Sequence, residues 1–315
     1  MAIVAIVGAG LIGRAWAITF ARGGCEVRLY DGNAGVAQQA LDFAEEVLPL
    51  LADEELLEGQ MPEQVVARLH VVESLAAALD GATHVQESTP EELESKKRIF
   101  AELDRLAAPE TVLASSTSAI LPSMFTESLA GRSRCLVVHP INPPYLVPAA
   151  EIVPAPWTDL DVVERTRALI VSCGQSPIVM KRELDGFVMN RMQGALLEEA
   201  FRLVADGYAS IEDVDTGIRE GLALRWSFMG PFETIDLNAP GGVGDYVRRY
   251  QQIYSRLFPS MQRRVDWAGE VLESVERDRR ARLPADQLQE RQKWRDRRLM
   301  ALAAHKRKAA RDIGS

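Results

Sequence analysis

The sequence predicts an α/β protein in which a doubly wound, mostly parallel Rossmann-type sheet precedes an all-helical C-terminal domain. Short β-branched runs alternate with longer amphipathic segments over the first half of the chain, an order typical of a parallel sheet with helices on both faces. A glycine-rich turn follows the first apolar run. From residue 184 onward, helical periodicity continues with almost no strand pattern. We therefore expect two domains, 1–183 and 184–315.

The first half supplies the expected sheet. Residues 2–7 are apolar at every position, which is typical of a strand buried on both faces. The other expected strands cover 26–31, 83–88, 111–116, 135–140, 149–154 and 176–181. The expected helices of this half cover 11–22, 34–51 and 91–107. This alternation favours crossover connections that bring the strands side by side.

The second half is expected to be helical throughout. Ser210, followed by Asp213 three residues later, is typical of a helix N-terminus. Residues 284–312 form one long helical pattern that is rich in arginine and lysine. Acidic residues are mixed among these bases, which favours a solvated helix face over an anion-binding arm.

Composition narrows the class of protein. The 315 residues are 47% hydrophobic and 26% charged, the balance of a soluble globular protein. A net charge of -9 argues against general nucleic-acid binding, which needs a basic surface. The opening apolar run is too short to span a membrane. Cys25, Cys135 and Cys173 lack the spacing of a metal site or a disulfide framework, which favours no metal and a reducing, cytoplasmic location.

The motif GAGLIG at residues 8–13 predicts a dinucleotide site. A strand precedes it, a helix follows it, and Asp31 ends the second strand about 20 residues later. Gly8 allows the tight turn, Gly10 lets backbone approach a pyrophosphate, and Gly13 lets helix and strand pack closely. A carboxylate at Asp31 favours NAD over NADP because it repels a 2′-phosphate. The expected cofactor-binding residues here are Gly8, Gly10, Leu11, Ile12, Gly13 and Asp31.

His139 is the best candidate for a catalytic base among the four histidines. It stands at the C-terminal end of an expected parallel strand, the edge where doubly wound sheets bind ligands. Glu151 follows on the next strand, and neighbouring parallel strands would hold the two together as base and orienting partner. His70 and His84 lie at strand starts without comparable partners, and His305 lies in the tail.

Five motifs occur in one order along the chain: SSTSAI (115–120), HPINPPY (139–145), PAAEIVP (148–154), DGFVMNR (185–191) and MGPFE (229–233). Together they resemble the 3-hydroxyacyl-CoA dehydrogenase family over essentially the whole chain. The form of the motifs is most similar to the branch of λ-crystallin and L-gulonate 3-dehydrogenase. The resemblance implies NAD-dependent oxidation of a 3-hydroxyl group.

The resemblance also implies roles for particular residues. His139 matches the family's catalytic base and Glu151 its orienting glutamate. Ser118 and Asn190 match positions that bind the substrate's C3 oxygen, and both can donate hydrogen bonds to a developing alkoxide. Taken alone, Ser118 is equally consistent with a turn, and Asn190 with a polar group at a helix start.

Two further positions are implied at the cofactor. Glu91 and Lys96 match residues that contact the cofactor's ribose and nicotinamide side. From the bare sequence they are equally consistent with an acid at a helix start and a surface lysine.

Arg225 bears on the choice of substrate. It lies in the run GLALRWSF, where acyl-CoA members of the family have a small apolar run. A guanidinium can grip a carboxylate in bidentate fashion, which favours L-gulonate or another short 3-hydroxy acid. A surface or interface ion pair is the alternative.

Other functions stay open. For 3-hydroxyacyl-CoA the chain lacks a basic groove, because 44–59 is acidic. For carnitine, Trp226, Phe228 and Tyr145 are candidates for an aromatic box. A crystallin-like structural protein and a non-catalytic NAD sensor are the alternatives outside catalysis. Members of the family pair through the helical domain, so the resemblance implies a homodimer.

Overall fold

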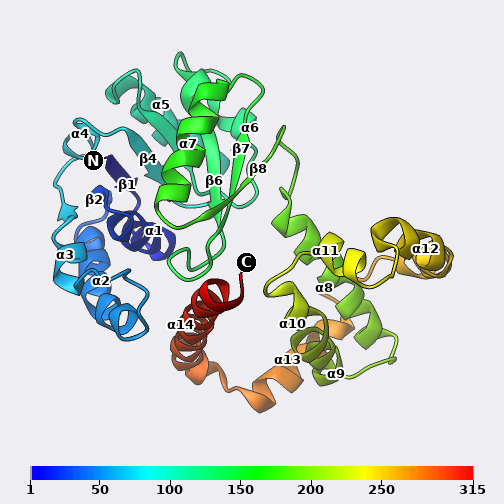
Figure 1. Ribbon diagram of the computed structural model, residues 1–315. Helices are drawn as coiled ribbons and strands as arrows, with labels where there is room; N and C mark the ends of the chain where they lie inside the picture. The colour runs from blue at the N-terminus through cyan, green and yellow to red at the C-terminus, as the bar shows by residue number, and fades with distance from the viewer. Residues whose placement is uncertain (1, 315) are drawn as a thin grey trace. The chain divides into compact units, whose positions relative to one another are not determined.

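An eight-stranded sheet forms the centre of the N-terminal part of the chain (Figure 1). The computed structural model describes residues 2–314. The strands are β1 (Ile3–Val7), β2 (Glu26–Tyr30), β3 (Leu69–Val71), β4 (His84–Glu87), β5 (Val112–Ser115), β6 (Cys135–Pro140), β7 (Ala149–Pro154) and β8 (Ser176–Val179). Their order is β3-β2-β1-β4-β5-β6-β7-β8. The predicted Rossmann-type sheet is confirmed, with one short edge strand, β3, that the sequence pattern missed.

The pairing of the last strands differs from the prediction. All neighbours are parallel except β6 and β7, which run antiparallel. The expectation that His139 and Glu151 lie on parallel neighbours is therefore wrong. Only residues 141–148 join the two strands, and a parallel crossover needs a dozen residues or more.

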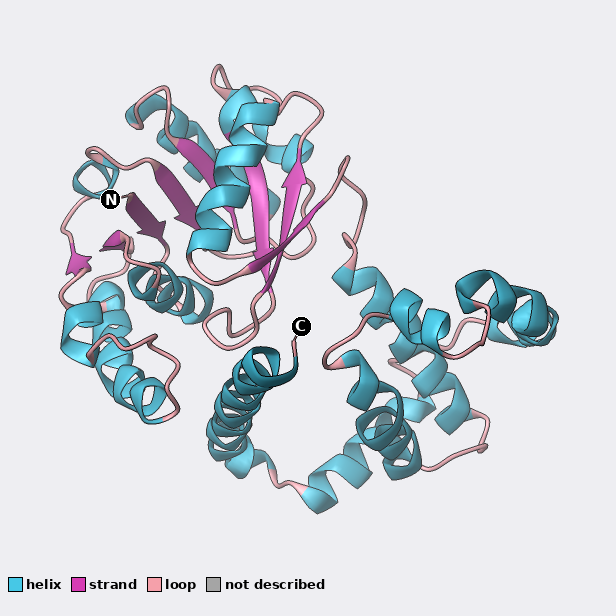
Figure 2. Ribbon diagram, viewed as in Figure 1, coloured by secondary structure: helices cyan, strands magenta, loops and turns pink. Residues whose placement is uncertain are grey.

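Helices cover both faces of the sheet (Figure 2). They are α1 (Leu11–Arg22), α2 (Val36–Asp53), α3 (Pro62–Val66), α4 (Leu75–Leu79), α5 (Leu93–Leu106), α6 (Pro122–Thr126), the 3-10 turn η1 (Arg132–Arg134) and α7 (Leu160–Ser172). One core cluster joins α1, α2 and α7 to the sheet, and a second joins α4, α5 and α6 to its other face. This is the doubly wound arrangement.

Strand β6 shows how the two faces position the site. Leu136 and Val138 belong to one core cluster, whereas Cys135 and Val137 belong to the other. Successive side chains of a strand point to opposite faces. All four are fully buried because helices cover both faces of the sheet. This anchoring leaves His139 near the end of the strand, at the edge where ligands bind.

The rest of the chain is helical. It comprises α8 (Met189–Ala205), α9 (Ile211–Thr216), the π-helix η2 (Gly217–Leu222), α10 (Ala223–Trp226), α11 (Pro231–Leu237), α12 (Gly242–Met261), α13 (Glu270–Arg282), the 3-10 turn η3 (Ala285–Gln287) and α14 (Leu288–Ile313). Two compact units divide the described residues: 2–190 with 296–304, and 191–295 with 305–314. Within the first unit, Met300 of α14 is buried in the larger core cluster.

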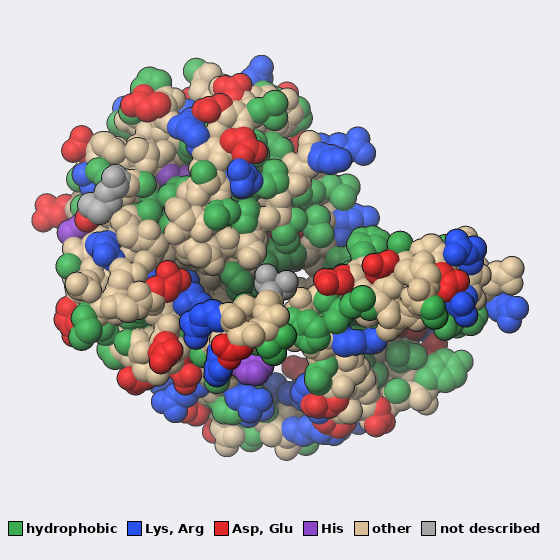
Figure 3. Space-filling view, viewed as in Figure 1, with side chains coloured by type: hydrophobic (Ala, Val, Ile, Leu, Met, Phe, Trp, Pro, Cys, Tyr) green, Lys and Arg blue, Asp and Glu red, His purple; other side chains and the backbone are tan. Residues whose placement is uncertain are grey.

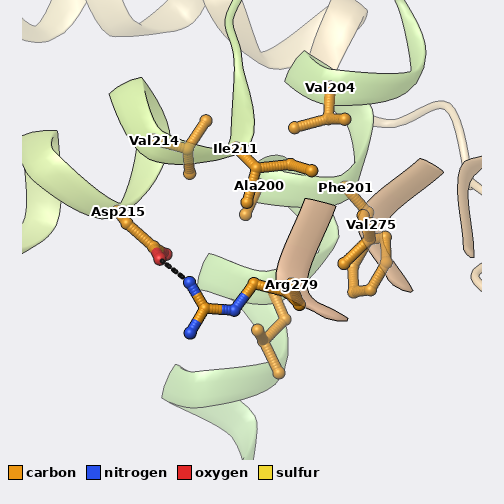
Figure 4. A pocket seen from close by; sticks show the side chains of 9 residues that line it. Ala200, Phe201, Val204, Ile211, Val214, Asp215, Val275 and Arg279 are labelled. Atoms are coloured by element: carbon orange, nitrogen blue, oxygen red, sulfur yellow. Dashed lines mark ion pairs between the residues drawn. The ribbon is translucent and has the colours of Figure 1, made fainter. Parts of the chain in front are cut away.

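Local interactions stabilise the helical unit. Ser210 and Asp213 form the predicted capping box at the start of α9. The rings of Phe201 and Trp267 stack at 4.9 Å between centroids. Helices α8, α9 and α13 line an apolar pocket of about 330 Å³, with an ion pair between Asp215 and Arg279 beside it (Figure 4). Among the described helices, none is long and apolar enough to cross a membrane.

Candidate active site

The glycine-rich turn between β1 and α1 has the geometry of a dinucleotide-binding loop. Gly8 has a φ of +92°, and a Cβ there would come within 2.7 Å of the Ser88 backbone. A Cβ at Gly13 would lie 1.9 Å from the Gly8 carbonyl oxygen. A Cβ at Gly10 would meet no atom of the described chain within 4 Å, so this position is open to a ligand. The three glycines thus fit the separate physical roles expected of them.

Asp31 borders the same turn. Its Oδ2 accepts a hydrogen bond from the Ala9 backbone N–H at 2.9 Å, and its Oδ1 accepts one from the Asn33 N–H at 2.8 Å. A cavity of about 560 Å³ opens here. Its lining includes Gly8, Gly10, Leu11, Ile12, Asp31, Ser88, Thr89 and Pro90. The open glycine, the helix N-terminus and the carboxylate together fit the pyrophosphate and ribose of NAD.

His139 and Glu151 face each other across β6 and β7. They are direct partners in the antiparallel register, and the His139 Nδ1 lies 2.7 Å from the Glu151 Oε2. Glu151 is fully buried and His139 is 6% exposed. Because Nδ1 donates to the carboxylate, Nε2 is the nitrogen left to act as an acceptor. Nε2 makes no hydrogen bond to any side chain or backbone group of residues 2–314.

The second oxygen of Glu151 is bound at the start of α8. Its Oε1 accepts hydrogen bonds from the backbone N–H groups of Val188 (2.6 Å) and Met189 (2.9 Å). Burial raises the pKa of Glu151, but the hydrogen bonds from His139, Met189 and Val188 outweigh it, so the net pKa lies below its ordinary value. The carboxylate therefore stays ionised near neutral pH and fixes the orientation of the imidazole.

Phe187 packs beside this pair. It is fully buried, and its ring centroid lies 5.6 Å from that of His139. Its φ is +50°, a left-handed conformation that bulky residues rarely adopt. This conformation directs the next two N–H groups toward Glu151. No sequence pattern indicated it, because a buried phenylalanine usually has an ordinary backbone.

The SSTS loop after β5 carries the other expected donors. Glu91 Oε1 accepts hydrogen bonds from the Thr117 hydroxyl at 2.5 Å and from the Ser118 backbone N–H at 2.9 Å. The Asn190 side-chain amide donates to the Ser118 carbonyl at 2.6 Å. The structure therefore brings Glu91, Ser118 and Asn190 into one hydrogen-bonded group. Thr117 was missed, although it lies between two residues of the predicted motif.

Lys96 is not at the surface. It is 1% exposed, and its Nζ lies 2.7 Å from Glu87 Oε1, with Glu87 fully buried. The alternative of a surface lysine is therefore wrong. Glu87, the last residue of β4, was missed because nothing in the run HVQES distinguishes a buried carboxylate from an exposed one.

Of the other strand histidines, His70 has an acidic partner, contrary to expectation, whereas His84 pairs with a neutral amide. His70 Nε2 lies 2.7 Å from Glu26 Oε2, and His84 Nε2 lies 3.2 Å from Gln86 Oε1. Burial lowers the pKa of His84 to about 4. His84 is the first residue of β4 and His70 is the middle residue of β3, so neither lies at the C-terminal end of its strand.

The helical unit carries Arg225. Its side chain is exposed, and its Nη1 donates to the Asn238 side-chain oxygen at 3.4 Å. Within residues 2–314 it has no ion pair with a carboxylate. Tyr145, expected as an aromatic-box residue, is buried in the core of the first unit, edge-on to Phe43 at 6.4 Å. It is therefore not available as an exposed wall for a cationic ligand.

Family models account for most of the chain. The NAD-binding domain of 3-hydroxyacyl-CoA dehydrogenase matches residues 3–183, and the C-terminal domain of the same enzyme matches residues 186–276. The chain belongs to the 3-hydroxyacyl-CoA dehydrogenase family. It is therefore an NAD-dependent oxidoreductase that acts on a CH–OH group.

The proteins to which this chain is similar have names that state different roles. A λ-crystallin homologue of Rattus norvegicus is 41% identical, covering 95% of each chain. An L-carnitine dehydrogenase of Oceanobacillus iheyensis is 37% identical, covering 76% of this chain and 77% of its own. The solved structure of an NAD+-dependent 5-formyl-3-hydroxy-2-methylpyridine-4-carboxylic acid 5-dehydrogenase has a TM-score of 0.82 and 27% identity, covering 96% of this chain and 97% of that one.

Proposed function

We propose that this protein oxidises the 3-hydroxyl group of a small hydroxy acid with NAD, most readily L-gulonate to 3-dehydro-L-gulonate. The observation that supports it best is the contact between the His139 Nδ1 and the buried Glu151 carboxylate. A secondary alcohol loses a proton when it is oxidised, and a positioned imidazole is the usual acceptor near neutral pH.

Different residues of the chain have different roles in the proposed reaction. His139 Nε2 takes the hydroxyl proton, and Glu151 stabilises the resulting imidazolium through Nδ1. When bound, NAD accepts the hydride from C3. Ser118 and Asn190, which are joined through the Ser118 carbonyl, donate hydrogen bonds to the C3 oxygen. Gly8, Gly10, Leu11, Ile12, Gly13, Asp31 and Glu91 hold the cofactor.

Arg225 is the proposed carboxylate-binding group. Its guanidinium is exposed, and its one hydrogen bond within the described chain is to a neutral amide. It therefore keeps its charge available for an anionic substrate. An Arg225→Met variant should raise the KM for short hydroxy acids about tenfold or more, since a charge-assisted bidentate pair is lost. An unchanged KM would remove Arg225 from the proposal.

A substrate screen tests the proposal as a whole. The purified protein with NAD is assayed against L-gulonate, 3-hydroxybutyrate, L-carnitine and 3-hydroxybutyryl-CoA, by following NADH absorbance. We expect the highest kcat/KM for L-gulonate. A His139→Gln variant should lose roughly 10²–10⁴-fold in kcat and keep its NADH affinity. Turnover that survives within a few-fold would contradict His139 as the base.

Two observations favour other candidates. The likeness to an L-carnitine dehydrogenase and the exposed rings of Trp226 and Phe228 favour carnitine, whose quaternary ammonium binds aromatic faces. The likeness to a λ-crystallin homologue favours a structural role. Preferred turnover of carnitine or of the CoA ester would replace L-gulonate, and failure to bind NADH would support the structural role.

A homodimer through the helical unit is part of the same proposal. Helix α12 has no fully buried residue, and its apolar side chains recur at intervals of three and four, which places them on one face. They are Val243, Val247, Tyr250, Ile253, Tyr254, Leu257, Phe258 and Met261. Figure 3 shows hydrophobic side chains at the surface of this unit. Contiguous exposed apolar surface of this kind marks an interface.

Light scattering after size exclusion should give twice the mass of one chain. A monomer at micromolar concentration would contradict the dimer. We also propose a cytoplasmic location, because Cys25, Cys135 and Cys173 are all free thiols, as expected in a reducing compartment.

A further inference from the structure

Two thiols meet in the larger core cluster of the first unit. Cys25 directly precedes β2 and Cys173 directly follows α7. They are 148 residues apart in sequence, yet their Sγ atoms lie 3.9 Å apart. Both side chains are buried, with 4% and 2% of their residues exposed. No spacing in the sequence indicated this pair, because it depends on the packing of distant segments.

Gly23 allows the two cysteine-bearing segments to approach each other. A Cβ at this position would lie 2.6 Å from the Cys173 Sγ and 2.7 Å from the Cys173 Cα, closer than real Cβ atoms come to other atoms. The turn that carries Cys25 therefore packs directly on the end of α7. A disulfide has an S–S bond of about 2.05 Å and Cβ atoms about 3.5–4.5 Å apart. With the segments in contact, side-chain rotation and a small backbone shift bring the two sulfurs within bonding distance.

The same two segments hold the loop over residues 141–148, which joins β6 to β7. Just before the first cysteine, Arg22 donates from Nη1 to the Tyr145 carbonyl at 3.0 Å. Just after the second, Gln175 donates from Nε2 to the Pro144 carbonyl at 3.0 Å. Each segment thus binds one of two adjacent carbonyls of the loop. A covalent bond between the segments would fix the separation of these two donors and restrain the loop between the strands of the candidate catalytic pair.

We propose that Cys25 and Cys173 are a site of reversible oxidation, at which a disulfide forms and restrains the loop over residues 141–148. The oxidant is a hydroperoxide, for which hydrogen peroxide serves as the probe. The Cys25 thiolate attacks one peroxide oxygen, the O–O bond breaks, and a sulfenic acid and one water result. The Cys173 sulfur then attacks the sulfenic sulfur, the S–O bond breaks, and a second water leaves. Two thiols are oxidised to one disulfide while one hydrogen peroxide is reduced to two waters.

The order of the two steps follows from the hydrogen bond between the sulfurs. This bond lowers the pKa of Cys25 despite its burial, and it raises the pKa of Cys173, which burial raises further. The thiolate is the nucleophile, so Cys25 reacts with the peroxide and Cys173 completes the disulfide. Cys135 differs, because burial raises its pKa to about 12 and its Sγ donates to the Gly131 carbonyl at 3.7 Å. It therefore stays a thiol.

Thiol titration of the denatured protein tests the site, with the full chain oxidised by hydrogen peroxide in its folded state. The count should fall from three free thiols to one, peptide mapping should join Cys25 to Cys173, and dithiothreitol should restore all three. The disulfide should raise Tm by about 5 °C or more, because it closes a long loop of the unfolded chain. Amide hydrogen exchange over residues 141–148 should slow.

Three single variants complete the test. Cys135→Ser is the matched control, because it removes a buried thiol outside the pair; it should still form the disulfide and gain the same Tm. Cys173→Ser should abolish both changes, and Cys25→Ser serves equally if that variant does not fold.

Two outcomes would contradict the proposal. A wild-type chain that keeps three thiols, stops at a sulfenic or sulfinic acid, or joins Cys135 overturns the site. A disulfide that leaves hydrogen exchange over residues 141–148 unchanged overturns the restraint of the loop. Because neither NAD nor substrate is present in these measurements, failure here leaves the proposed reaction untouched.

Discussion

The sheet edge of the first unit and the helices of the second unit differ in how their side chains are paired and buried. At the sheet edge, buried charges meet partners on neighbouring elements of the same unit, as in the Glu87–Lys96 and Glu151–His139 pairs. Along α12, large apolar side chains stay at the surface. The difference teaches that the candidate catalytic edge is preorganised within one chain, whereas we propose that the helical unit is completed by another surface.

The largest expected effect is at the preorganised edge. In the proposed mechanism, Glu151→Gln removes the charge that stabilises the imidazolium, and it should lower kcat about 10³-fold, a barrier increase of ~4 kcal/mol. NADH affinity should be unchanged, because Glu151 does not line the cofactor cavity. Steady-state kinetics and NADH titration measure the two quantities. Glu164→Gln, which removes an exposed carboxylate paired with Arg167, is the control and should change neither. A loss of less than tenfold for Glu151→Gln would show that the edge is not organised by this charge.

The next effect tests whether the helical unit depends on another chain. Val247 on α12 is 42% exposed, and Val247→Glu would place a charge in the proposed dimer interface. We expect the dimer dissociation constant to rise at least 100-fold, about 3 kcal/mol, measured by sedimentation or light scattering over a dilution series.

Val171→Glu is the matched control for this change. Val171 lies on α7 of the first unit and is 48% exposed, so the same substitution at similar exposure should leave association unchanged. If the two variants dissociate to the same extent, or if neither dissociates, the α12 face is not the dimer interface.

The smallest effect concerns pH and the first unit alone. The pKa of His84 is lowered to about 4 by burial, whereas an unfolded histidine titrates near 6.5. The unfolded state therefore binds the proton first, so stability is present above pH 6.5 and is lost as the pH falls toward 4. Protonation of His84 in the unfolded state should therefore lower the free energy of unfolding by about 2 kcal/mol between pH 7 and pH 5.

His84→Gln should flatten that part of the stability curve, measured by denaturant unfolding at a series of pH values. Thr111→Val serves as a buried, non-titrating control, because Thr111 donates to the Ala82 carbonyl beside the same strand. It should lower stability equally at every pH. An unchanged slope for His84→Gln would contradict the neutral buried histidine.

Much of the fold was predictable because it depends on local periodicity and on one motif. Apolar runs predicted the central strands within a residue or two, and GAGLIG predicted the tight turn between β1 and α1. The direction of β7 was missed although the information was present. The short connection over residues 141–148 cannot hold a parallel crossover, and this constraint outweighs the βαβ pattern of the preceding chain.

The site was predictable only in part, for a physical reason. His139 and Glu151 are recognisable because histidine chemistry and strand ends limit the choices. Three features arise from contacts between distant segments. They are the buried charge of Glu87, its ion pair with Lys96 and the left-handed backbone of Phe187. Residue type and spacing carry no record of such contacts, so these features required three-dimensional structure.

The return of α14 to the first unit has a consequence for biosynthesis. Met300, with Leu299 and Ala303 beside it, packs against a cluster otherwise built from residues before 174. Residues up to about 304 must therefore be synthesised and leave the ribosome before this core can close. Until then, the emerging sheet domain presents an uncovered apolar patch, which is the kind of surface that chaperones bind and that promotes aggregation. The core of the first unit is therefore completed only after α14 has been synthesised.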